Sequence, residues 1–313
     1  MPELVCHSLT IPCSHLLTNG KITFQINAVY ADNIRFVRRK GLAYGIAWAA
    51  SGFSGLILPY VFSWLLSQYS FRTTLRIWVI VIILLASTAL MALKPRLPYT
   101  SVVRAYRVRL TFVKDIRFVA FILGNVLVSL GYFLPGIYLP SYARSMGFSS
   151  DIATTSLSLL NVGTFLGFVC GGYITDRWSS SSVVCTSTLG TTLAVLFFWG
   201  FASNAALLIT FAIIYAFFGA CFTMTWSGFT RDFLRDDRTR TAEFGTIYGF
   251  FISGRGVGNL LSGPLSQALL HLPSLTGSFG FGYGSGFGSL VVFTAVTAVC
   301  GGLGPLYEGV SMI

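Results

Sequence analysis

One arginine inside an apolar stretch has the clearest chemical task in this chain. Arg255 is the only charged residue of Gly245–Leu270, a segment that would cross a bilayer as a helix of roughly 39 Å. A cation at mid-bilayer costs roughly 2.5–3.5 kcal/mol on insertion scales, so it needs polar surroundings. At about 100° per residue, its helix face also carries Tyr248, Asn259 and Ser262. This face is typical of a wet cavity; the alternative is that Arg255 snorkels or pairs with carbonyl oxygens for structure alone.

Glycines form two ridges that favour close helix packing. One lies about a quarter-turn from the polar face of Gly245–Leu270 and consists of Gly245, Gly249, Gly256 and Gly263. The other makes two successive Gly-x-x-x-Gly steps in Ile152–Ile174, at Gly163, Gly167 and Gly171. Small residues at these spacings let helix backbones approach each other, so we predict a tight helix contact at both ridges.

Motifs of catalysis and cofactor binding do not occur in the sequence. There is no P-loop GxxxxGK[ST], HExxH or GxSxG motif, and the three histidines lie outside the apolar stretches. The six cysteines form no CxxC pair, which argues against a zinc site or a disulfide framework. We therefore predict a protein that is not an enzyme and holds no cofactor or metal.

Composition indicates an integral membrane protein. Hydrophobic residues make up 54% of the 313 residues and charged residues only 10%, against about 25% charged in soluble domains. The mean hydropathy is +0.73. A net charge of +11 would suit a nucleic-acid binder, but the basic residues are spread among the apolar stretches instead of gathering on one soluble domain. We therefore expect the lipid bilayer, and no nucleic acid, as a partner.

Eight apolar stretches predict an all-α bundle of membrane-spanning helices. They are Gly41–Ser67, Ile77–Leu93, Phe118–Leu139, Ile152–Ile174, Val183–Phe201, Ala206–Met224, Gly245–Leu270 and Gly288–Tyr307. The chain divides into a poorly ordered segment (1–34), a two-helix part (35–93), a basic loop (94–117) and a six-helix part (118–313). The basic loop is expected to lie against anionic lipid, the alternative being a specific binding site.

The distribution of basic residues predicts the orientation. Eight spans return both termini to one side, and that side carries seventeen Lys and Arg residues against three on the other. Cytoplasmic loops are rich in Lys and Arg, so we expect both termini in the cytoplasm. We expect the plasma membrane as the location.

Several segments resemble the major facilitator superfamily. Gly172-x-x-x-Asp176-Arg177 is similar to the loop motif of that superfamily. Residues 39–52, RKGLAYGIAWAASG, resemble the signature that opens the fifth helix of monocarboxylate-transporter-like members. Residues 134–142, LPGIYLPSY, and 254–259, GRGVGN, are similar to the fungal branch of that group. The resemblance covers roughly residues 35–307, although the loop motif alone is shared by the whole superfamily.

This resemblance implies an incomplete twelve-helix transporter. Such proteins have two six-helix halves that rock about a site at the membrane midplane. The basic loop would lie between the halves, so the chain would hold the last two-thirds of the fold and lack four helices at the front. We expect a fragment or a mispredicted gene product, or a true short form, that does not transport alone unless helices of a partner replace the missing spans.

The resemblance also implies roles for particular residues. Asp176 would accept hydrogen bonds from helix-end amides or pair with a neighbouring arginine, and Arg177 would offer a partner across the loop. The expected gating residues are Asp176, Arg177, Gly172, Arg38 and Arg39; the alternative is that the charges are solvated. The expected substrate-binding residues are Arg255, Asn259, Asn161, Asn125, Tyr132 and Tyr248, although each polar residue alone more often joins helices.

The predicted function is secondary transport of small organic anions, such as monocarboxylates or related metabolites. The span matching the eighth helix, Ile152–Ile174, lacks the Asp and Arg pair of animal monocarboxylate carriers, so proton coupling through that pair is not predicted. The alternative is a non-transporting membrane partner or sensor derived from a carrier.

Overall fold

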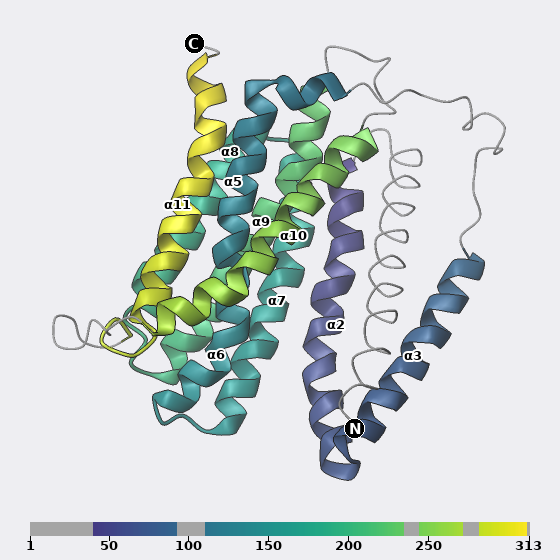
Figure 1. Cartoon of the computed structure of the whole chain (residues 1–313), viewed down its shortest axis with the longest axis vertical. Coiled ribbons are helices and arrows are strands. Elements are labelled where there is room, and N and C mark those ends of the chain that lie inside the picture. The colour runs from purple at the N-terminus through teal and green to yellow at the C-terminus, as the bar shows by residue number, and fades with distance from the viewer. Residues whose placement is uncertain (1–39, 93–109, 235–243, 272–281, 312–313) are drawn as a thin grey trace, which may run out of the picture.

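The computed structural model describes residues 40–92, 110–234, 244–271 and 282–311. Every regular element in these ranges is helical, and the helices run side by side in an elongated bundle except α3, which stands apart from it (Figure 1). This confirms the predicted all-α helix bundle. The N-terminal segment 1–34, most of the basic loop 94–117 and the expected gating residues Arg38 and Arg39 lie outside the described residues.

The helix bounds agree with most predicted spans. Single helices form where one was expected for α2 (Lys40–Gln68), α3 (Phe71–Ala92), α7 (Ser150–Thr175), α9 (Ala205–Phe233), α10 (Phe244–Leu270) and α11 (Gly288–Ser311). A short 3-10 helix, η1 (Leu110–Lys114), precedes the second group of helices. The stretch predicted as Val183–Phe201 begins as α8 (Ser180–Leu193) and ends in a π-helical segment, η2 (Ala194–Trp199).

The predicted span Phe118–Leu139 lies within one candidate membrane span, Ile116–Ser145, whose helix is interrupted at one residue. The helix α5 (Ile116–Tyr132) ends one residue before α6 (Leu134–Ser145) begins, and Phe133 is the junction. Pro135 lies in the first turn of α6, where its missing N–H costs nothing, whereas a continuous helix would lose a hydrogen bond at this point. The break therefore follows from the position of one proline.

Short polar side chains set where four helices begin. The side chains of Asp115, Ser149, Ser179 and Asn204 each accept a hydrogen bond from an amide in the first turn of α5, α7, α8 and α9. These bonds satisfy amides that a helix cannot satisfy itself.

Glycines of α7 hold it against α9, as predicted. A Cβ added at Gly163 or Gly167 would overlap the carbonyl oxygens of Ile213 and Phe217, and one at Gly171 would lie 2.8 Å from the Cα of Cys221. Backbones this close permit no side chain in between.

The glycine ridge predicted on α10 is wrong. Among the described residues, nothing lies within 4 Å of a Cβ added at Gly245, Gly249, Gly256 or Gly263. The close contact is made instead by Gly258, where an added Cβ would lie 2.6 Å from the Cβ of Ser129 on α5. Gly254 also faces α5. The helical repeat of 3.6 residues per turn shows that the two groups of glycines lie on different faces of α10. It does not show which face meets a neighbouring helix, because tertiary packing decides that.

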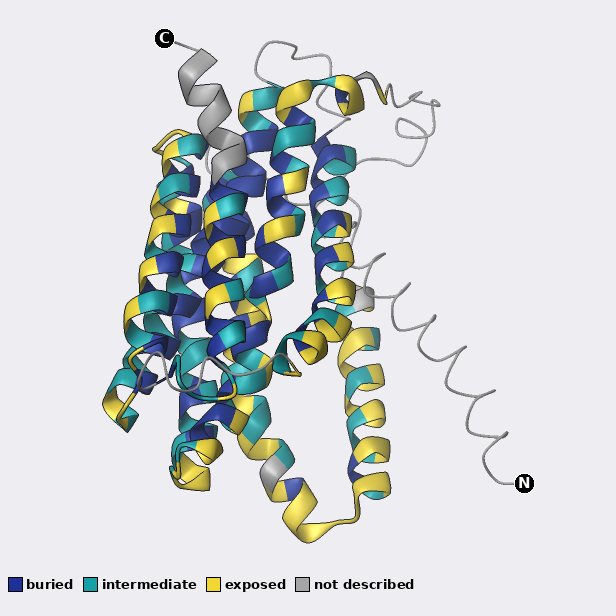
Figure 2. Cartoon of the chain, turned by 60° about the vertical axis from the view of Figure 1, so that its left-hand side comes forward, coloured by how far each residue is buried: buried dark blue, intermediate teal, exposed yellow. Residues whose placement is uncertain are grey.

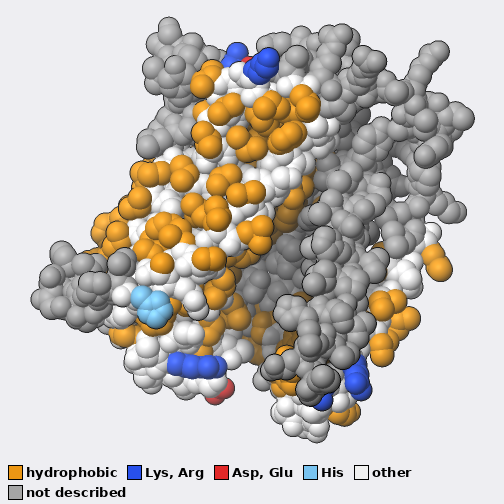
Figure 3. Space-filling view, viewed as in Figure 1, with side chains coloured by type: hydrophobic (Ala, Val, Ile, Leu, Met, Phe, Trp, Pro, Cys, Tyr) orange, Lys and Arg blue, Asp and Glu red, His pale blue; other side chains and the backbone are white. Residues whose placement is uncertain are grey.

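The surface of the bundle suits lipid. Six described helices are long and apolar enough to cross a membrane by length and composition, while Gly288–Gly302 is shorter and α10 is not among the six. Most buried residues lie inside the six-helix part, and exposed ones predominate on α3 (Figure 2). In the face shown in Figure 3, hydrophobic side chains cover the middle, and the described Lys and Arg side chains lie toward the two ends. The chain is an integral, multi-pass membrane protein.

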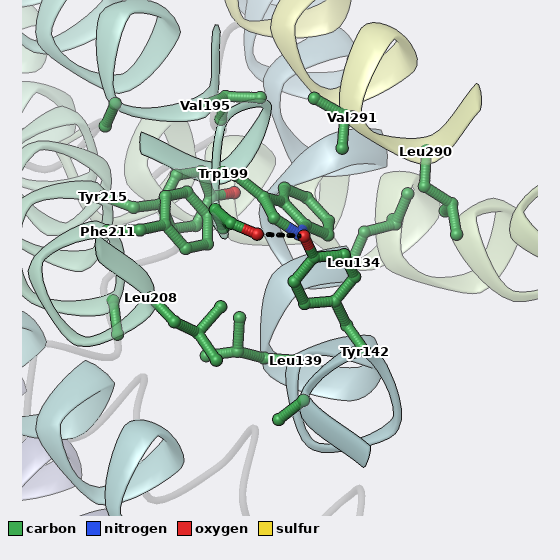
Figure 4. Close-up of a cluster of buried hydrophobic side chains, with 14 of the residues drawn as sticks. Leu134, Leu139, Tyr142, Val195, Trp199, Leu208, Phe211, Tyr215, Leu290 and Val291 are labelled. Atoms are coloured by element: carbon green, nitrogen blue, oxygen red, sulfur yellow. Dashed lines mark hydrogen bonds between the residues drawn. The ribbon is translucent and has the colours of Figure 1, made fainter. Parts of the chain in front are cut away.

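An aromatic cluster fixes the end of the bundle at which α6 lies. Trp199, Phe211 and Tyr142 are fully buried there, and Tyr142 donates a 3.0 Å hydrogen bond to the carbonyl of Ala202 (Figure 4). The Tyr283 hydroxyl donates to the carbonyl of Leu196 in η2 at 2.8 Å. Burial raises the pKa of Tyr283, so its phenol stays protonated as a donor. The second half of the broken span is therefore held firmly.

Candidate functional site

Arg255 lies where α5, α9 and α10 meet. Its guanidinium carbon is 4.1 Å from the ring centroid of Tyr132, 5.4 Å from that of Phe133 and 5.5 Å from that of Trp226. One Nη donates a hydrogen bond to the hydroxyl of Thr223 on α9. The side chain therefore contacts side chains of neighbouring elements, a hydroxyl and three aromatic rings.

Neutral groups surround this cation. No described Asp or Glu forms an ion pair with Arg255. A guanidinium over an aromatic face gains about 0.5–2 kcal/mol, so the rings offset part of the cost of a charge at this depth. The guanidinium has five N–H donors, and Thr223 accepts from one Nη. The arrangement can therefore bind an anion at the remaining donors.

The end of α5 brings Tyr132 against the cation. The carbonyl of Tyr132 accepts a 3.0 Å hydrogen bond from the hydroxyl of Tyr215, which fixes the end of the helix. On the other side, Gly219 gives the ring room, because an added Cβ would lie 2.7 Å from Cε2 of Tyr132. Tyr132 is thus positioned by two residues of α9.

Asn125 joins the three helices behind Arg255. It is 1% exposed, its Nδ2 donates to the carbonyl of Phe251 at 2.8 Å, and its Oδ1 accepts from Nε1 of Trp226 at 3.0 Å. Sequence reasoning expected substrate contact here. Because the side chain is buried and both its polar atoms are engaged, the structure gives it the task of positioning Trp226 and α10.

The other three residues predicted to bind substrate have different surroundings. Asn259 is one turn further along α10, and its Oδ1 is buried without a hydrogen-bond partner among the described residues. Tyr248 is 1% exposed and accepts a 2.9 Å hydrogen bond from Nε1 of Trp48 on α2. Asn161 lies at the crossing of α7 and α2, where an added Cβ on Gly55 would lie 2.6 Å from its Cγ. The structure therefore does not bring Asn161 to Arg255.

A second charged centre lies at the N-terminal end of α2. Asp176, which follows α7, accepts hydrogen bonds from the amides of Gly41 at 2.8 Å and Leu42 at 2.9 Å. These are first-turn amides, which have no partner within the helix and carry the positive end of its dipole. Arg231 of α9 lies 3.7 Å from the same carboxylate. We call Asp176, Arg231 and the two amides the Asp176 network.

Arg231 extends this network to one further element, α8. Its Nη2 donates to the carbonyl of Thr175 at 3.2 Å, and its Nε lies 3.2 Å from a carboxylate oxygen of Asp232. Asp232 in turn accepts a 2.7 Å hydrogen bond from the hydroxyl of Ser180. The ends of α2, α7, α8 and α9 are thereby joined.

The other predicted gating residues have different contacts. A Cβ added at Gly172 would lie 2.5 Å from the carbonyl oxygen of Gly41, so this glycine permits the crossing of α7 and α2. Arg177 was expected to offer a partner across the loop, but its guanidinium carbon lies 4.5 Å from the ring centroid of Tyr173, in the last turn of the preceding helix α7. Among the described residues, the arginine that pairs with Asp176 is Arg231.

Comparison with known proteins identifies the family. A model of the Major Facilitator Superfamily matches residues 26–263 and also residues 121–303. The chain belongs to the Major Facilitator Superfamily.

The chain is similar to several curated fungal proteins. The aspyridones efflux protein apdF of Emericella nidulans is 27% identical over 89% of this chain and 53% of its own length. The MFS-type transporter hasB of Aspergillus fumigatus is 26% identical over 86% of the chain and 60% of its own length. The agnestins efflux protein of Paecilomyces divaricatus is 24% identical over 78% and 54%. The chain thus spans about half the length of the curated relatives it matches.

The residues of α9 that contact Arg255 were not predicted from the sequence. Thr223 and Trp226 are both fully buried and were treated as part of an ordinary span. The available signal was the run of hydroxyl residues in an otherwise apolar helix, at Thr223, Thr225 and Ser227. Phe133 was missed because the break that exposes it was not predicted.

Proposed function

We propose that this chain carries the second half of a secondary transporter that exports small organic anions. Arg255 is the evidence for an anionic substrate. It is a cation near the middle of α10, in contact with residues of α5 and α9, and its partners among the described residues are all neutral. A cation of this kind inside a membrane marks a substrate or ion pathway. Outward transport is supported by relatives named as efflux proteins. The relatives' names do not single out monocarboxylates, so we propose organic anions as the wider class.

In this proposal α2 and α3 belong to the first half of the transporter and α5 to α11 form the second. The Asp176 network then joins the halves, because α2 contributes the amides and α7 and α9 contribute the charges. We place this end of the bundle, with both termini, in the cytoplasm of cells whose plasma membrane holds the protein. The network would hold the cytoplasmic side closed and must open in each transport cycle.

Anion binding tests the role of Arg255. The purified chain in lipid nanodiscs is titrated with a labelled organic acid, and the Arg255→Gln variant is compared with Arg144→Gln, which removes a charge at the end of α6. We expect Arg255→Gln to weaken binding at least tenfold, because hydrogen bonds to a charged group contribute about 1.5–3 kcal/mol, and Arg144→Gln to have no effect. Equal binding by all three proteins would remove Arg255 from the site.

Transport is measured separately in vesicles. Efflux of the labelled acid is followed from vesicles that contain the chain alone and from vesicles that also contain the N-terminal four-helix part of the aspyridones efflux protein. We expect efflux only with the added helices, and none with the Arg255→Gln variant. Binding without efflux in both preparations would favour a non-transporting partner or sensor.

Orientation is tested by protease protection. A protease-sensitive tag is placed at either terminus, and intact cells and permeabilised cells are treated with protease. Cleavage of both tags only after permeabilisation is expected, while cleavage in intact cells would overturn the proposed topology.

A further inference from the structure

We propose that the Arg255 site selects flat, conjugated organic anions over saturated anions of the same size, and that Phe133 determines this selectivity. The inference rests on the proposed function, since it names the substrate class of the same site. It depends on three observations: how close the guanidinium lies to an aromatic ring, which ring beside it is exposed, and where space remains.

The guanidinium lies close to an aromatic ring. Its carbon is 4.1 Å from the centroid of the Tyr132 ring, a distance at which a planar cation can stack on the ring. A planar cation that stacks on one ring still presents its N–H edge, which matches the two oxygens of a carboxylate. An anion bound at that edge lies beside aromatic surface rather than among aliphatic side chains.

Phe133 provides the aromatic surface next to this edge. Its ring centroid is 5.4 Å from the guanidinium carbon, and the residue is 39% exposed, whereas Trp226 is fully buried. Phe133 packs edge-to-face on Tyr132, with ring centroids 5.0 Å apart and planes at 80°. The Tyr132 and Phe133 rings therefore form a corner beside the cation, and the exposed ring is available to a ligand.

The backbone around this corner leaves room. Nothing described lies within 4 Å of a Cβ added at Gly136, one turn beyond Phe133, or at Gly256, next to Arg255. Phe133 sits at the junction of α5 and α6, and its side chain is exposed there. A flat ring can stack on Phe133 while its acid group reaches Arg255.

The observations favour a flat anion over a saturated one. The positive charge selects an anion, because no described carboxylate competes for it. Aromatic pairs gain about 0.5–1.5 kcal/mol beyond the area they bury, which corresponds to roughly a twofold to twelvefold preference for a conjugated ring. A saturated ring of the same size gains burial but not this increment.

Three matched compounds test the proposal on the purified chain in phosphatidylcholine nanodiscs. They are 2-naphthoate, its saturated counterpart decahydro-2-naphthoate, and the neutral 2-naphthamide, with binding measured by equilibrium dialysis. We expect 2-naphthoate to bind about tenfold more tightly than the saturated acid, and the amide to bind most weakly. Equal Kd values for the two acids would overturn the proposal and favour a general site for apolar anions such as fatty acids.

Two substitutions assign the selectivity. Phe133→Leu keeps an apolar side chain and is expected to raise the Kd of 2-naphthoate roughly threefold to tenfold, with the saturated acid unchanged. Retained binding of the saturated acid also shows that the variant is folded. Phe197→Leu changes an exposed ring on η2 and is expected to alter neither Kd. If Phe133→Leu leaves the preference for the flat acid intact, Phe133 does not determine it.

Different experimental outcomes would contradict the proposed function and the proposed substrate class. If Arg255→Gln weakens both acids equally but wild-type protein binds them alike, the anion site stands and the preference for flat anions is wrong. If Arg255→Gln changes neither affinity, the anion site itself is wrong. If Phe133→Leu does not fold, the comparison of the two acids on the wild-type protein still decides the preference.

Discussion

The two charged centres of this chain differ in how completely the protein neutralises them. Asp176 has two backbone amides at 2.8 and 2.9 Å and an arginine at 3.7 Å. Arg255 has three rings and one hydroxyl, all neutral. The first charge joins helix ends through partners that the chain itself supplies, whereas the second keeps unused donors and lacks a counterion among the described residues.

This difference separates a charge that supports the fold from one that supports binding. A carboxylate with matched donors contributes stability, and removing it leaves unsatisfied amides. A cation without a counterion costs stability, and in the function we propose it persists because it binds a ligand that the chain does not contain. Substitutions at the two centres should therefore affect stability and binding in opposite ways.

The largest loss of stability is expected at Asp176. In Asp176→Ala, two amides of α2 lose charged acceptors, and we expect the free energy of unfolding to fall by about 2–4 kcal/mol. The ion pair with Arg231 adds little, because the Arg231 side chain is 38% exposed. Unfolding is measured in mixed detergent micelles, with Asp151→Ala, in the exposed first turn of α7, as the control. Equal stability of the two variants would make Asp176 a solvated charge.

Glycines at the same crossing provide the second test. In Gly172→Ala, the new Cβ would lie 2.5 Å from the carbonyl oxygen of Gly41, so α2 must move away from α7. We expect a loss of about 1–3 kcal/mol. Gly256→Ala on α10 is the matched control, because an added Cβ meets nothing described within 4 Å, and it should gain about 0.5–1 kcal/mol from helix propensity. A loss at Gly256 as large as at Gly172 would show that the open face of α10 is covered.

Periodicity alone predicted where helices form but not which of their faces meet. The positions of the helices and the glycine ridge of α7 follow from hydropathy and spacing. The glycine ridge of α10 failed because that helix carries glycines on several faces, and Gly258 is the one that reaches α5. The choice between such faces depends on the register between helices, which a single sequence does not state.

Site residues on α9 were missed for the same physical reason, since their contacts depend on how helices pack. Thr223 and Trp226 approach Arg255 from another helix, 29 or more positions away in the chain, so no local pattern connects them. Arg231 pairs with Asp176 from a still larger separation in the chain, whereas Arg177, next to Asp176, contacts Tyr173 at the end of the preceding helix α7. The break at Phe133 was readable from Pro135, but the apolar residues on both sides made the stretch resemble one span.

A smaller loss of stability is expected behind the cation. Asn125→Ala leaves Nε1 of Trp226 without its acceptor and frees the carbonyl of Phe251. Hydrogen bonds between membrane helices contribute about 0.6 kcal/mol on average, so two of them predict a loss of about 1 kcal/mol. Because Trp226 also moves, tryptophan fluorescence should change. Asn161→Ala, whose Nδ2 donates within α7, is the control. An unchanged spectrum would contradict the positioning role.

The smallest effect on stability, and the sharpest contrast with Asp176, is expected at Arg255 itself. Arg255→Met keeps an unbranched apolar stem over the Tyr132 ring and removes a charge that has no described counterion. The lost cation–π contacts and the relieved cost of the buried charge offset each other, so the free energy of unfolding should change by less than about 1 kcal/mol. Binding of the organic acid should nevertheless be lost. A loss of stability as large as that of Asp176→Ala would mean that the fold, and not a ligand, requires this guanidinium.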